Sequence, residues 1–278
     1  MQTVTGKRVL ITGAAMGMGR LFAQRAADEG ASHVVLWDLN AKALKTAAKE
    51  LAQTGATIRT DVVDVGDRVA VAAAAEKVLA DVGTIDILVN NAGVVRGNHY
   101  FWETDPERDM ALTMDINALG PMAVARAFLP SMIEGSEDRR LVNLASAAGL
   151  TANPRLAAYA ASKWAVVGWS ESVRLELVQA GYQHVKVTTV CPYYIKTGMF
   201  DGATSAPLLP LLEPEDVVDE TWRAMLKGKP FVIMPRTVLL SEAFKGIVPI
   251  WMRDFLADKV FGIYHTMDDF HGRETVKD

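Results

Sequence analysis

The chain has 278 residues, of which 50% are hydrophobic and 22% charged, so it is long and apolar enough to bury a large core. This composition excludes the disordered, collagen-like and disulfide-stapled classes of protein. The 29 basic and 33 acidic residues leave a formal charge of −4, which gives no electrostatic reason to expect a nucleic-acid partner.

Seven short β-branched runs alternate with longer, Ala-rich amphipathic stretches. The runs predict strands at residues 8–12, 34–37, 57–60, 85–90, 141–145, 185–190 and 231–234. The stretches predict helices that include residues 20–29, 41–53, 68–81, 114–132 and 159–179. Strands that are apolar without alternation are buried on both faces, which is typical of a parallel sheet covered by helices. Arg139 and Arg140, just before the fifth strand, are expected in a solvated loop.

The predicted fold class is therefore α/β, a doubly wound parallel sheet of Rossmann type. We expect residues 1–278 to form a single domain, with a core at about 6–235 and a helical C-terminal extension at about 198–278. Ligands of such sheets bind beyond the carboxyl ends of the strands, so functional residues should follow the strands directly.

A glycine-rich turn follows the first predicted strand and leads directly into a helix. Its spacing is G-x-x-x-G-x-G, and glycine lets backbone N–H groups approach a pyrophosphate at a helix N-terminus. The predicted cofactor residues of this turn are Gly13, Ala15, Met16, Gly17, Met18 and Gly19.

Asp38 ends the second predicted strand and lies about 20 residues after the glycines, where a carboxylate can accept hydrogen bonds from an adenosine ribose. The same charge would repel a 2′-phosphate, so NAD is favoured over NADP, and Leu39 is expected beside it. The alternative role of Asp38 is to cap the helix that begins near Ala41.

Further candidate cofactor residues follow the third and fourth predicted strands. Asp64 can accept from an adenine amino group, although a role in the loop is equally compatible with its position. Small residues after the fourth strand would let the backbone lie close to the nucleoside. The residues predicted here are Asp64, Val65, Asn90, Ala92 and Gly93.

Ser146 follows the fifth predicted strand, and Tyr159 and Lys163 lie on one face of the next helix because they are four residues apart. An ammonium near a phenol lowers the phenol pKa from about 10, so that the phenol can exchange a proton with an alcohol oxygen. Ser146 would hold the same oxygen with a second hydrogen bond.

Together the glycine turn, the Asn-Asn-Ala-Gly run, Ser146 and Tyr159-x-x-x-Lys163, in this order, resemble the short-chain dehydrogenase/reductase family over residues 6 to 235. The resemblance implies hydride transfer between a nicotinamide and a carbonyl or alcohol carbon. It makes Tyr159 the general acid/base and Ser146 the group that orients the substrate oxygen. Lys163 is then expected to lower the phenol pKa and to bind the nicotinamide ribose.

The resemblance extends to two more segments. Asn117 matches an Asn whose family role is to hold a water that links Lys163 to solvent. Residues 192–197 resemble the family's Pro-Gly-x-x-x-Thr segment, in which Pro192, Ile195 and Thr197 would contact the nicotinamide. Tyr193 stands where the family usually has Gly, so the path of this loop is uncertain and its ring is available to the substrate.

Within the family, the chain looks most like the retinol dehydrogenase and 17β-hydroxysteroid dehydrogenase branch, through residues 36–40, 212–218 and 267–270. The implied substrate is a bulky, lipophilic secondary alcohol or ketone. Candidate substrate residues are Ser146, Leu150, Tyr193, Met199 and Phe200. The alternatives are a protein that senses nicotinamide nucleotides without turnover, and a retinol- or steroid-type dehydrogenase at a membrane surface.

The remaining expectations concern surroundings and partners. Cys191 is the single cysteine and no secretion signal is recognisable, so a cytoplasmic location is expected. No apolar run reaches about 20 residues, so no membrane-spanning segment is expected. The five histidines are scattered, which predicts no metal site.

By family resemblance, residues 114–132 and 159–179 would form the interface of a homodimer or homotetramer. The apolar residues 238–264 would close the substrate pocket, form a subunit interface or lie on a membrane.

Overall fold

The computed structural model describes residues 1–207 and 209–272, and its centre is a seven-stranded parallel sheet in the order β3-β2-β1-β4-β5-β6-β7. The order reverses at β1, from which one half of the sheet runs to β3 and the other to β7. All seven predicted strands are present. Their bounds are β1 Arg8–Thr12, β2 His33–Asp38, β3 Thr57–Val62, β4 Ile87–Asn90, β5 Arg139–Leu144, β6 Val185–Pro192 and β7 Phe231–Met234.

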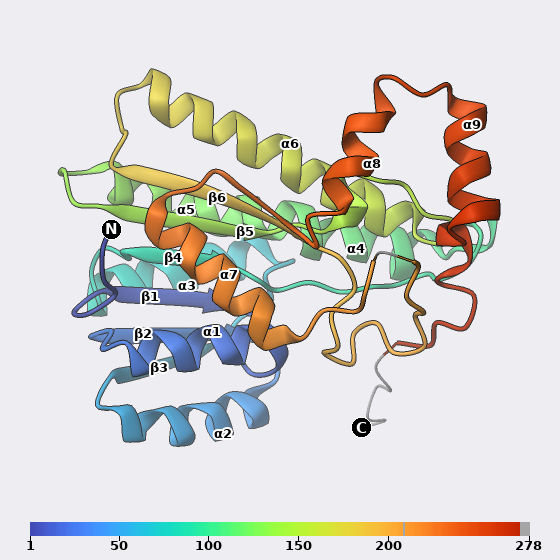
Figure 1. Ribbon diagram of the computed structural model, residues 1–278. Helices are drawn as coiled ribbons and strands as arrows, with labels where there is room; N and C mark the ends of the chain where they lie inside the picture. Colours follow the sequence, from blue (N-terminus) through green and yellow to red (C-terminus); the bar gives the residue numbers. More distant parts are fainter. Residues whose placement is uncertain (208, 273–278) are drawn as a thin grey trace.

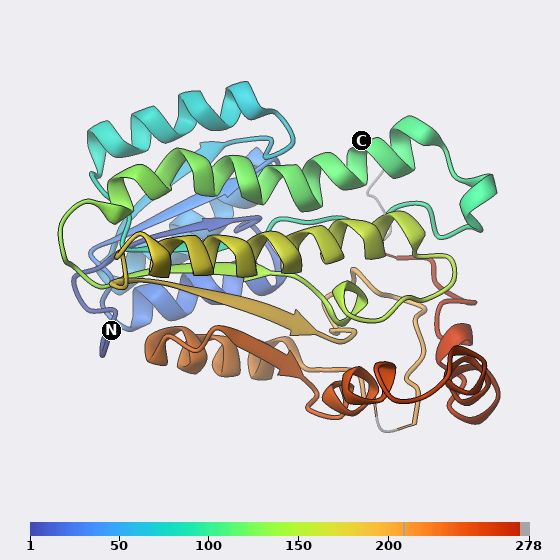
Figure 2. The same ribbon diagram turned by 90° about the horizontal axis from the view of Figure 1, so that it is seen from above.

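Helices cover both faces of the sheet (Figures 1 and 2). One face carries α1 Gly17–Asp28, α2 Ala41–Leu51 and α7 Pro214–Lys227, and the other carries α3 Arg68–Asp81, α5 Gly120–Ile133 and α6 Ala157–Gln179. The predicted doubly wound, Rossmann-type, single-domain fold is therefore confirmed. The proposed boundaries between core and extension stay a prediction.

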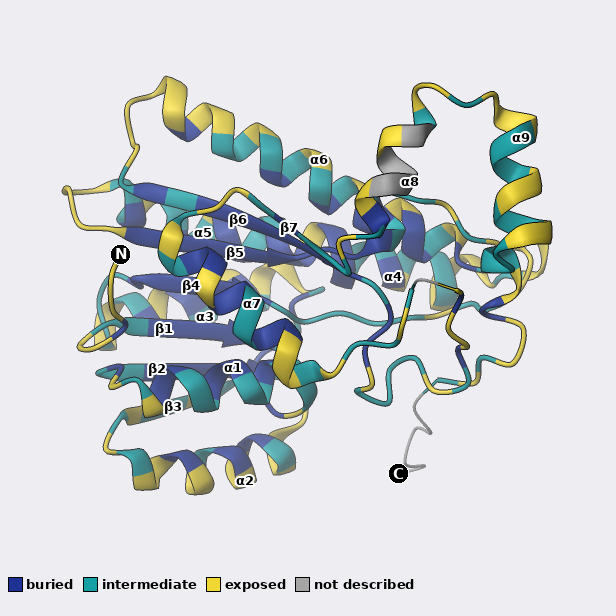
Figure 3. Cartoon of the chain, viewed as in Figure 1, coloured by how far each residue is buried: buried dark blue, intermediate teal, exposed yellow. Residues whose placement is uncertain are grey.

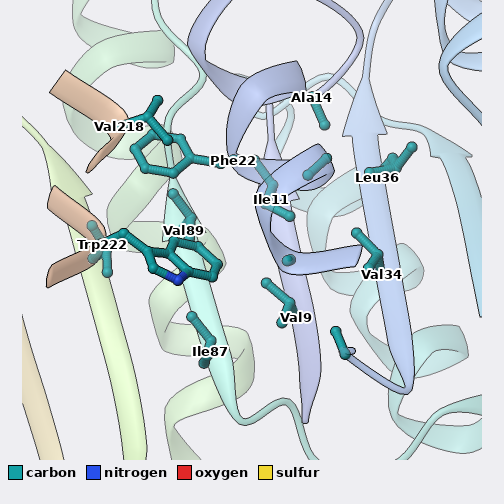
Figure 4. Close-up of a cluster of buried hydrophobic side chains, with 14 of the residues drawn as sticks. Val9, Ile11, Ala14, Phe22, Val34, Leu36, Ile87, Val89, Val218 and Trp222 are labelled. Atoms are coloured by element: carbon teal, nitrogen blue, oxygen red, sulfur yellow. The ribbon is translucent and has the colours of Figure 1, made fainter. Parts of the chain in front are cut away.

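Two hydrophobic clusters, one on each face, hold the helices to the sheet. On the α1 side, the Phe22 and Trp222 rings stack with centroids 6.3 Å apart over strand residues such as Ile11, Val89 and Leu36 (Figure 4). Colouring by burial shows the inner strands as the most deeply buried elements (Figure 3), whereas the edge strand β3 has no buried residue. Burial on both faces explains why the sequences of the inner strands are continuously apolar.

The expectation for Arg139 and Arg140 is wrong, because β5 begins at Arg139 and both side chains are buried. Arg139 forms an ion pair with the buried Asp86. Arg140 donates from Nε to the Met225 carbonyl oxygen at 2.8 Å, near the C-terminus of α7. A guanidinium can enter the core only where such acceptors meet it, and these acceptors come from distant parts of the chain.

Residues 106–133 form one long helical stretch that contains two π-helical turns, Pro106–Ala111 and Asp115–Leu119, joined by α4 Leu112–Met114. By length and composition alone this stretch could cross a membrane, since it contains an 18-residue window with a mean hydropathy of 1.2. Half of that window is buried, and residues of α5 pack in the core cluster with α3 and the sheet. Packing against the sheet is sufficient to explain its apolar face.

The C-terminal part leaves the sheet after β7 and forms a hairpin of α8 Val238–Lys245 and α9 Ile250–Phe255, beyond the carboxyl ends of the strands (Figure 1). A π-helical turn, Leu256–Val260, extends α9. The chain then returns towards the sheet as residues 266–272, which we call the C-terminal strap.

Candidate active site

A cavity of about 260 Å³ opens at the carboxyl ends of the central strands, on both sides of the point where the strand order reverses. It is lined by most of the predicted cofactor residues together with three predicted catalytic ones. The predicted residues on its wall are Gly13, Met16, Gly17, Met18, Asp38, Leu39, Asp64, Val65, Ala92, Gly93, Ser146, Tyr159, Lys163, Pro192, Tyr193, Ile195, Thr197, Met199 and Phe200.

Close packing requires glycine at two positions of the turn after β1. A Cβ on Gly19 would lie 2.0 Å from the Gly13 carbonyl oxygen, and one on Gly13, where φ is +64°, would lie 2.9 Å from the Ala92 Cα. Gly17 differs, because a Cβ there would meet nothing closer than Thr197 at 3.8 Å. The backbone at Gly17 therefore borders open space at the start of α1, as a cradle for a pyrophosphate requires.

Two side chains that the sequence analysis did not assign attach this turn to β4. The Thr12 hydroxyl accepts hydrogen bonds from the Asn91 and Ala92 N–H groups, both at 3.0 Å. The Asn91 amide donates to the carbonyl oxygens of Thr12 at 2.9 Å and Gly13 at 3.1 Å. The Asn-Asn-Ala-Gly run carries the signal for this attachment, and its second Asn, not its first, makes it.

Asn90 has a structural role instead. Its buried amide donates to the Pro121 carbonyl oxygen at 3.2 Å and to Asn143 Oδ1 at 2.9 Å, and it does not line the cavity. Alternation along β4 explains the difference, because consecutive side chains of a strand point to opposite sides.

Asp38 lies at the end of β2, and its carboxylate is bound to the glycine-rich turn. Oδ2 accepts a hydrogen bond from the Ala15 N–H at 3.0 Å, and Oδ1 accepts one from the Asn40 N–H at 2.9 Å. The cap of α2 is Asn40, whose side chain accepts from the Ala43 N–H, so Asp38 does not serve as that cap. Asp38 and the exposed Leu39 both border the cavity.

Asp64 and Val65 continue this end of the cavity after β3. Asp64 Oδ1 accepts from the Gly66 N–H at 2.8 Å, which is the loop role that the sequence left open for it. The other oxygen of this carboxylate has no protein partner among the hydrogen bonds of the described residues.

Ser146, Tyr159 and Lys163 come together at the centre of the cavity, and all three are buried. Ser146 Oγ accepts from the Ala148 N–H at 3.1 Å, which fixes the serine at the end of β5, and the Tyr159 phenol lies near it. Lys163 Nζ donates to the Leu144 carbonyl oxygen at 2.9 Å and lies 5.7 Å from the centre of the Tyr159 ring.

Burial dominates the proton affinities of this group. It raises the pKa of the Tyr159 phenol, against the smaller opposing effect of the nearby Ser146 hydroxyl. Burial also lowers the pKa of Lys163 to about 8. Burial therefore moves the phenol pKa in the direction opposite to the predicted one, because loss of hydration disfavours the charged phenolate.

Asn117 lies behind this group, in the second π-helical turn, and does not line the cavity. Its side chain accepts from the Val94 N–H and donates to the Val94 carbonyl oxygen, both at 2.8 Å. A Cβ on Gly93 would lie 3.2 Å from Asn117 Oδ1 and 3.7 Å from Lys163 Nζ, so Asn117 and Lys163 converge there. The π turn places an amide beside the buried ammonium, in keeping with the frequent location of such turns at functional sites.

The loop after β6 covers the other end of the cavity. Its residues Ile195, Thr197, Met199 and Phe200 line the wall, and the Phe200 ring meets the Tyr159 ring edge-on with centroids 6.0 Å apart. The buried Tyr193 hydroxyl makes no hydrogen bond, although Thr266 is near it. Leu150 packs against another cluster, around Val166 and Cys191, and lies outside the cavity wall.

The C-terminal strap packs against this loop, a contact that the sequence did not predict. Its buried Met267 joins Tyr159, Tyr194 and Phe200 in one apolar cluster. Asn153 holds the strap by donating to Thr266 Oγ1 at 3.1 Å and to the Tyr194 hydroxyl at 2.8 Å. No local pattern could place these residues together, because more than 100 residues separate Asn153 from Thr266.

Comparison with known proteins assigns this site to a family. A family model described as short chain dehydrogenase matches residues 7–207. The chain belongs to the short-chain dehydrogenase family. As the motifs predict, its relatives come from the retinol and 17β-hydroxysteroid branch. It is 38% identical to human epidermal retinol dehydrogenase 2 over 272 residues, which is 97% of this chain and 86% of the relative. It is 37% identical to human estradiol 17-beta-dehydrogenase 11 over 248 residues, or 89% of this chain and 81% of the relative.

Solved structures of the family agree with the fold and the cofactor class. A short-chain dehydrogenase/reductase from Burkholderia phymatum in complex with NAD has a TM-score of 0.80 at 29% identity, covering 88% of this chain and 95% of the other. A metagenomic short-chain oxidoreductase in complex with NADP has a TM-score of 0.70 at 29% identity, covering 83% and 95%. The cofactor of this oxidoreductase is therefore a nicotinamide dinucleotide. The open cradle at Gly17 and the carboxylate at the end of β2 fit such a molecule.

Proposed function

We propose that this oxidoreductase interconverts a bulky, lipophilic secondary alcohol and its ketone, with Tyr159 as the general acid/base. The observation that carries the proposal is the convergence of Ser146, Tyr159 and Lys163 in one buried group on the cavity wall. A bound nicotinamide supplies the site for the hydride. The residues of the chain then have to hold the substrate oxygen and move its proton.

The geometry gives each residue a part in that step. The hydroxyls of Ser146 and Tyr159 lie near each other on the cavity wall, so both can bond to one substrate oxygen between them. In alcohol oxidation Tyr159 takes the hydroxyl proton, and in ketone reduction it returns the proton to the oxygen. Lys163 keeps a cationic group beside the phenol, and Asn117 connects the site to the backbone at Val94.

Asp38 supports NAD as the preferred form of the cofactor. Its carboxylate already binds two backbone N–H groups and lies at the edge of the cavity. A 2′-phosphate brought there would meet a negative charge, whereas ribose hydroxyls can donate to it.

The substrate class is supported by the apolar wall beside Tyr159. Met199 and Phe200 line the cavity there, and Met267 packs behind Phe200. Flexible Met and aromatic Phe suit large apolar ligands. Relatives are named for retinol, which is a lipophilic primary alcohol, and for estradiol, whose 17β-hydroxyl is secondary, and both names agree with a bulky, lipophilic substrate here.

We propose a homodimer or homotetramer as the assembly, as the family resemblance implies. A groove between α5 and α6 is lined mainly by apolar side chains, among them Leu129, Ile133, Trp169 and Val173. Sedimentation equilibrium of the wild type and of Trp169→Glu tests this, since the charge should leave monomers if the groove is the interface.

The test of the activity is NADH formation from a series of secondary alcohols of increasing apolar size. The expected result is that kcat/KM rises with size and that NAD is preferred to NADP. Turnover of short alcohols alone would contradict the substrate class. Tight NAD binding without turnover of any alcohol or ketone would instead support a nucleotide sensor.

A further inference from the structure

The hairpin of α8 and α9 turns large apolar side chains outward. Ile247 is 80% exposed, Trp251 72% and Phe255 56%, and Ile250 and Val260 are also exposed. The cavity wall contains none of these side chains, so they do not close the substrate pocket. Of the three roles expected for residues 238–264, closure of the substrate pocket is therefore excluded for these five side chains, which leaves a subunit interface or a membrane contact.

A second exposed apolar group comes from the loop between β4 and the long helix. Trp102 is 79% exposed, and its ring stacks on that of Tyr100 with centroids 5.0 Å apart. Phe101 between them is also exposed. We call residues 100–102 the aromatic loop.

The hairpin and the aromatic loop lie at the same end of the molecule, beyond the carboxyl ends of the strands. Figures 1 and 2, which differ by a rotation about the horizontal axis, both place them at the right-hand extreme. The cavity opens at this end as well, because its wall is built from the loops that follow the strands.

A chain of contacts connects the two apolar groups. The Arg155 guanidinium lies 5.2 Å from the centre of the Tyr100 ring and 3.5 Å from an oxygen of Asp268 in the strap. His265 bonds Asp268 at 3.0 Å and, on its other side, Asp258 in the turn that extends α9, at 2.9 Å. The two groups therefore belong to one connected face.

Two basic side chains of the hairpin and of the turn that extends α9 are each paired with a neighbouring aspartate. Lys259 pairs with Asp258 at 2.9 Å and Arg253 with Asp254 at 3.4 Å. Glu103 accepts a hydrogen bond from the Tyr100 N–H within its own loop. This arrangement does not give the face a strong charge of one sign for an acidic or basic protein partner.

We propose that the hairpin and the aromatic loop together dock the enzyme on the surface of a zwitterionic phospholipid bilayer. Trp and Tyr favour the boundary between headgroups and acyl chains, and exposed Ile and Phe gain free energy by entering it. Two separate projections can rest on one fluid, flat surface, whereas a second protein would need a shape that matches both. The cavity would then open towards the bilayer, which matters for substrate entry only if the proposed lipophilic substrate is correct.

Flotation of the full chain with phosphatidylcholine vesicles tests the proposal, in parallel with the double variant Trp102→Ser/Trp251→Ser. The matched control is Leu175→Ser in α6, because Leu175 is 55% exposed but lies towards the opposite end of the molecule. We expect the wild type and the control to float equally, at low and at high salt. The double variant should lose roughly tenfold or more in partitioning. Its turnover of a short, water-soluble alcohol should equal that of the wild type, which reports folding separately.

Several outcomes would overturn the proposal. These are a wild type that stays at the bottom of the gradient, equal flotation of the double variant, and flotation only with anionic vesicles at low salt. A wild-type dimer that the double variant converts to monomer would make a second copy the partner. Flotation without turnover of any alcohol would contradict the proposed function and leave the docking surface standing.

Discussion

The two ends of the active site are built in different ways. At the cofactor end, backbone groups and small residues at the ends of β1, β2 and β4 form the wall, fixed by hydrogen bonds such as those of Thr12, Asn91 and Asp38. At the substrate end, side chains from the loop after β6 and from the C-terminal strap pack on Tyr159. Changes to the close packing of the glycine-rich turn at the first end should therefore disturb the whole protein, and changes at the second end should alter substrate handling alone.

The largest effect is expected at Gly19. Gly19→Ala would place a Cβ 2.0 Å from the Gly13 carbonyl oxygen, so the turn or α1 must shift. We expect the free energy of unfolding to fall by about 3 kcal/mol or more, with loss of NAD binding. Urea denaturation and NAD titration measure both.

The matched control is Gly168→Ala in α6, where an added Cβ meets nothing within 4 Å. Because alanine favours helix, this variant should gain up to about 1 kcal/mol. Equal stability of the two variants would show that the close contact at Gly19 is not what fixes the turn.

Lys163→Met should stabilise the protein without cofactor while abolishing turnover. The buried ammonium has its pKa lowered from 10.5 to about 8, so folding opposes its charge. The free-energy cost of burying this charge is largest below pH 8, where Lys163 is protonated in both the folded and the unfolded protein. It shrinks as the pH rises from 8 to 10.5, because the folded protein then loses the proton while the unfolded protein keeps it. We expect a gain of about 2 kcal/mol at pH 7 that declines above pH 8 in denaturation at several pH values. A gain in stability that does not depend on pH would show that the buried charge of Lys163 is not what destabilises the folded protein.

Asp38→Ala should change the choice of cofactor and leave the chemistry intact. Removing the carboxylate abolishes an acceptor for ribose hydroxyls and the repulsion of a 2′-phosphate. We expect kcat/KM for NAD to fall about tenfold relative to that for NADP, with a similar kcat. An unchanged ratio in initial-rate measurements would remove Asp38 from cofactor selection.

The smallest effect is expected at the strap. Asn153→Ala removes the hydrogen bonds to Thr266 and Tyr194 that hold the strap beside the loop. KM for a bulky alcohol should rise several-fold, by roughly 1 kcal/mol in apparent binding, while KM for NAD stays constant. Equal changes in both KM values would mean that the two ends are not separable.

The same division explains what could be predicted from the sequence. The strands, Gly13, Asp38, Ser146, Tyr159 and Lys163 follow from short local patterns, and the structure brings these side chains to one cavity. Asn90 and Asn91 cannot be told apart by local sequence, because which of the two meets the turn after β1 depends on where β4 ends.

The remaining parts depend on tertiary contacts. The burial of Arg140 depends on the end of α7, and the strap reaches Asn153 across more than 100 residues. The rise in the phenol pKa follows from burial that no spacing of Tyr and Lys reveals.

The central claim is that Tyr159 moves the proton of the substrate, and comparison of Tyr159→Phe with the wild type tests it most directly. Initial rates of NADH formation from a bulky secondary alcohol should fall by about 10³-fold, while the NAD dissociation constant from calorimetry stays within about twofold. Wild-type rates in this variant would contradict the account.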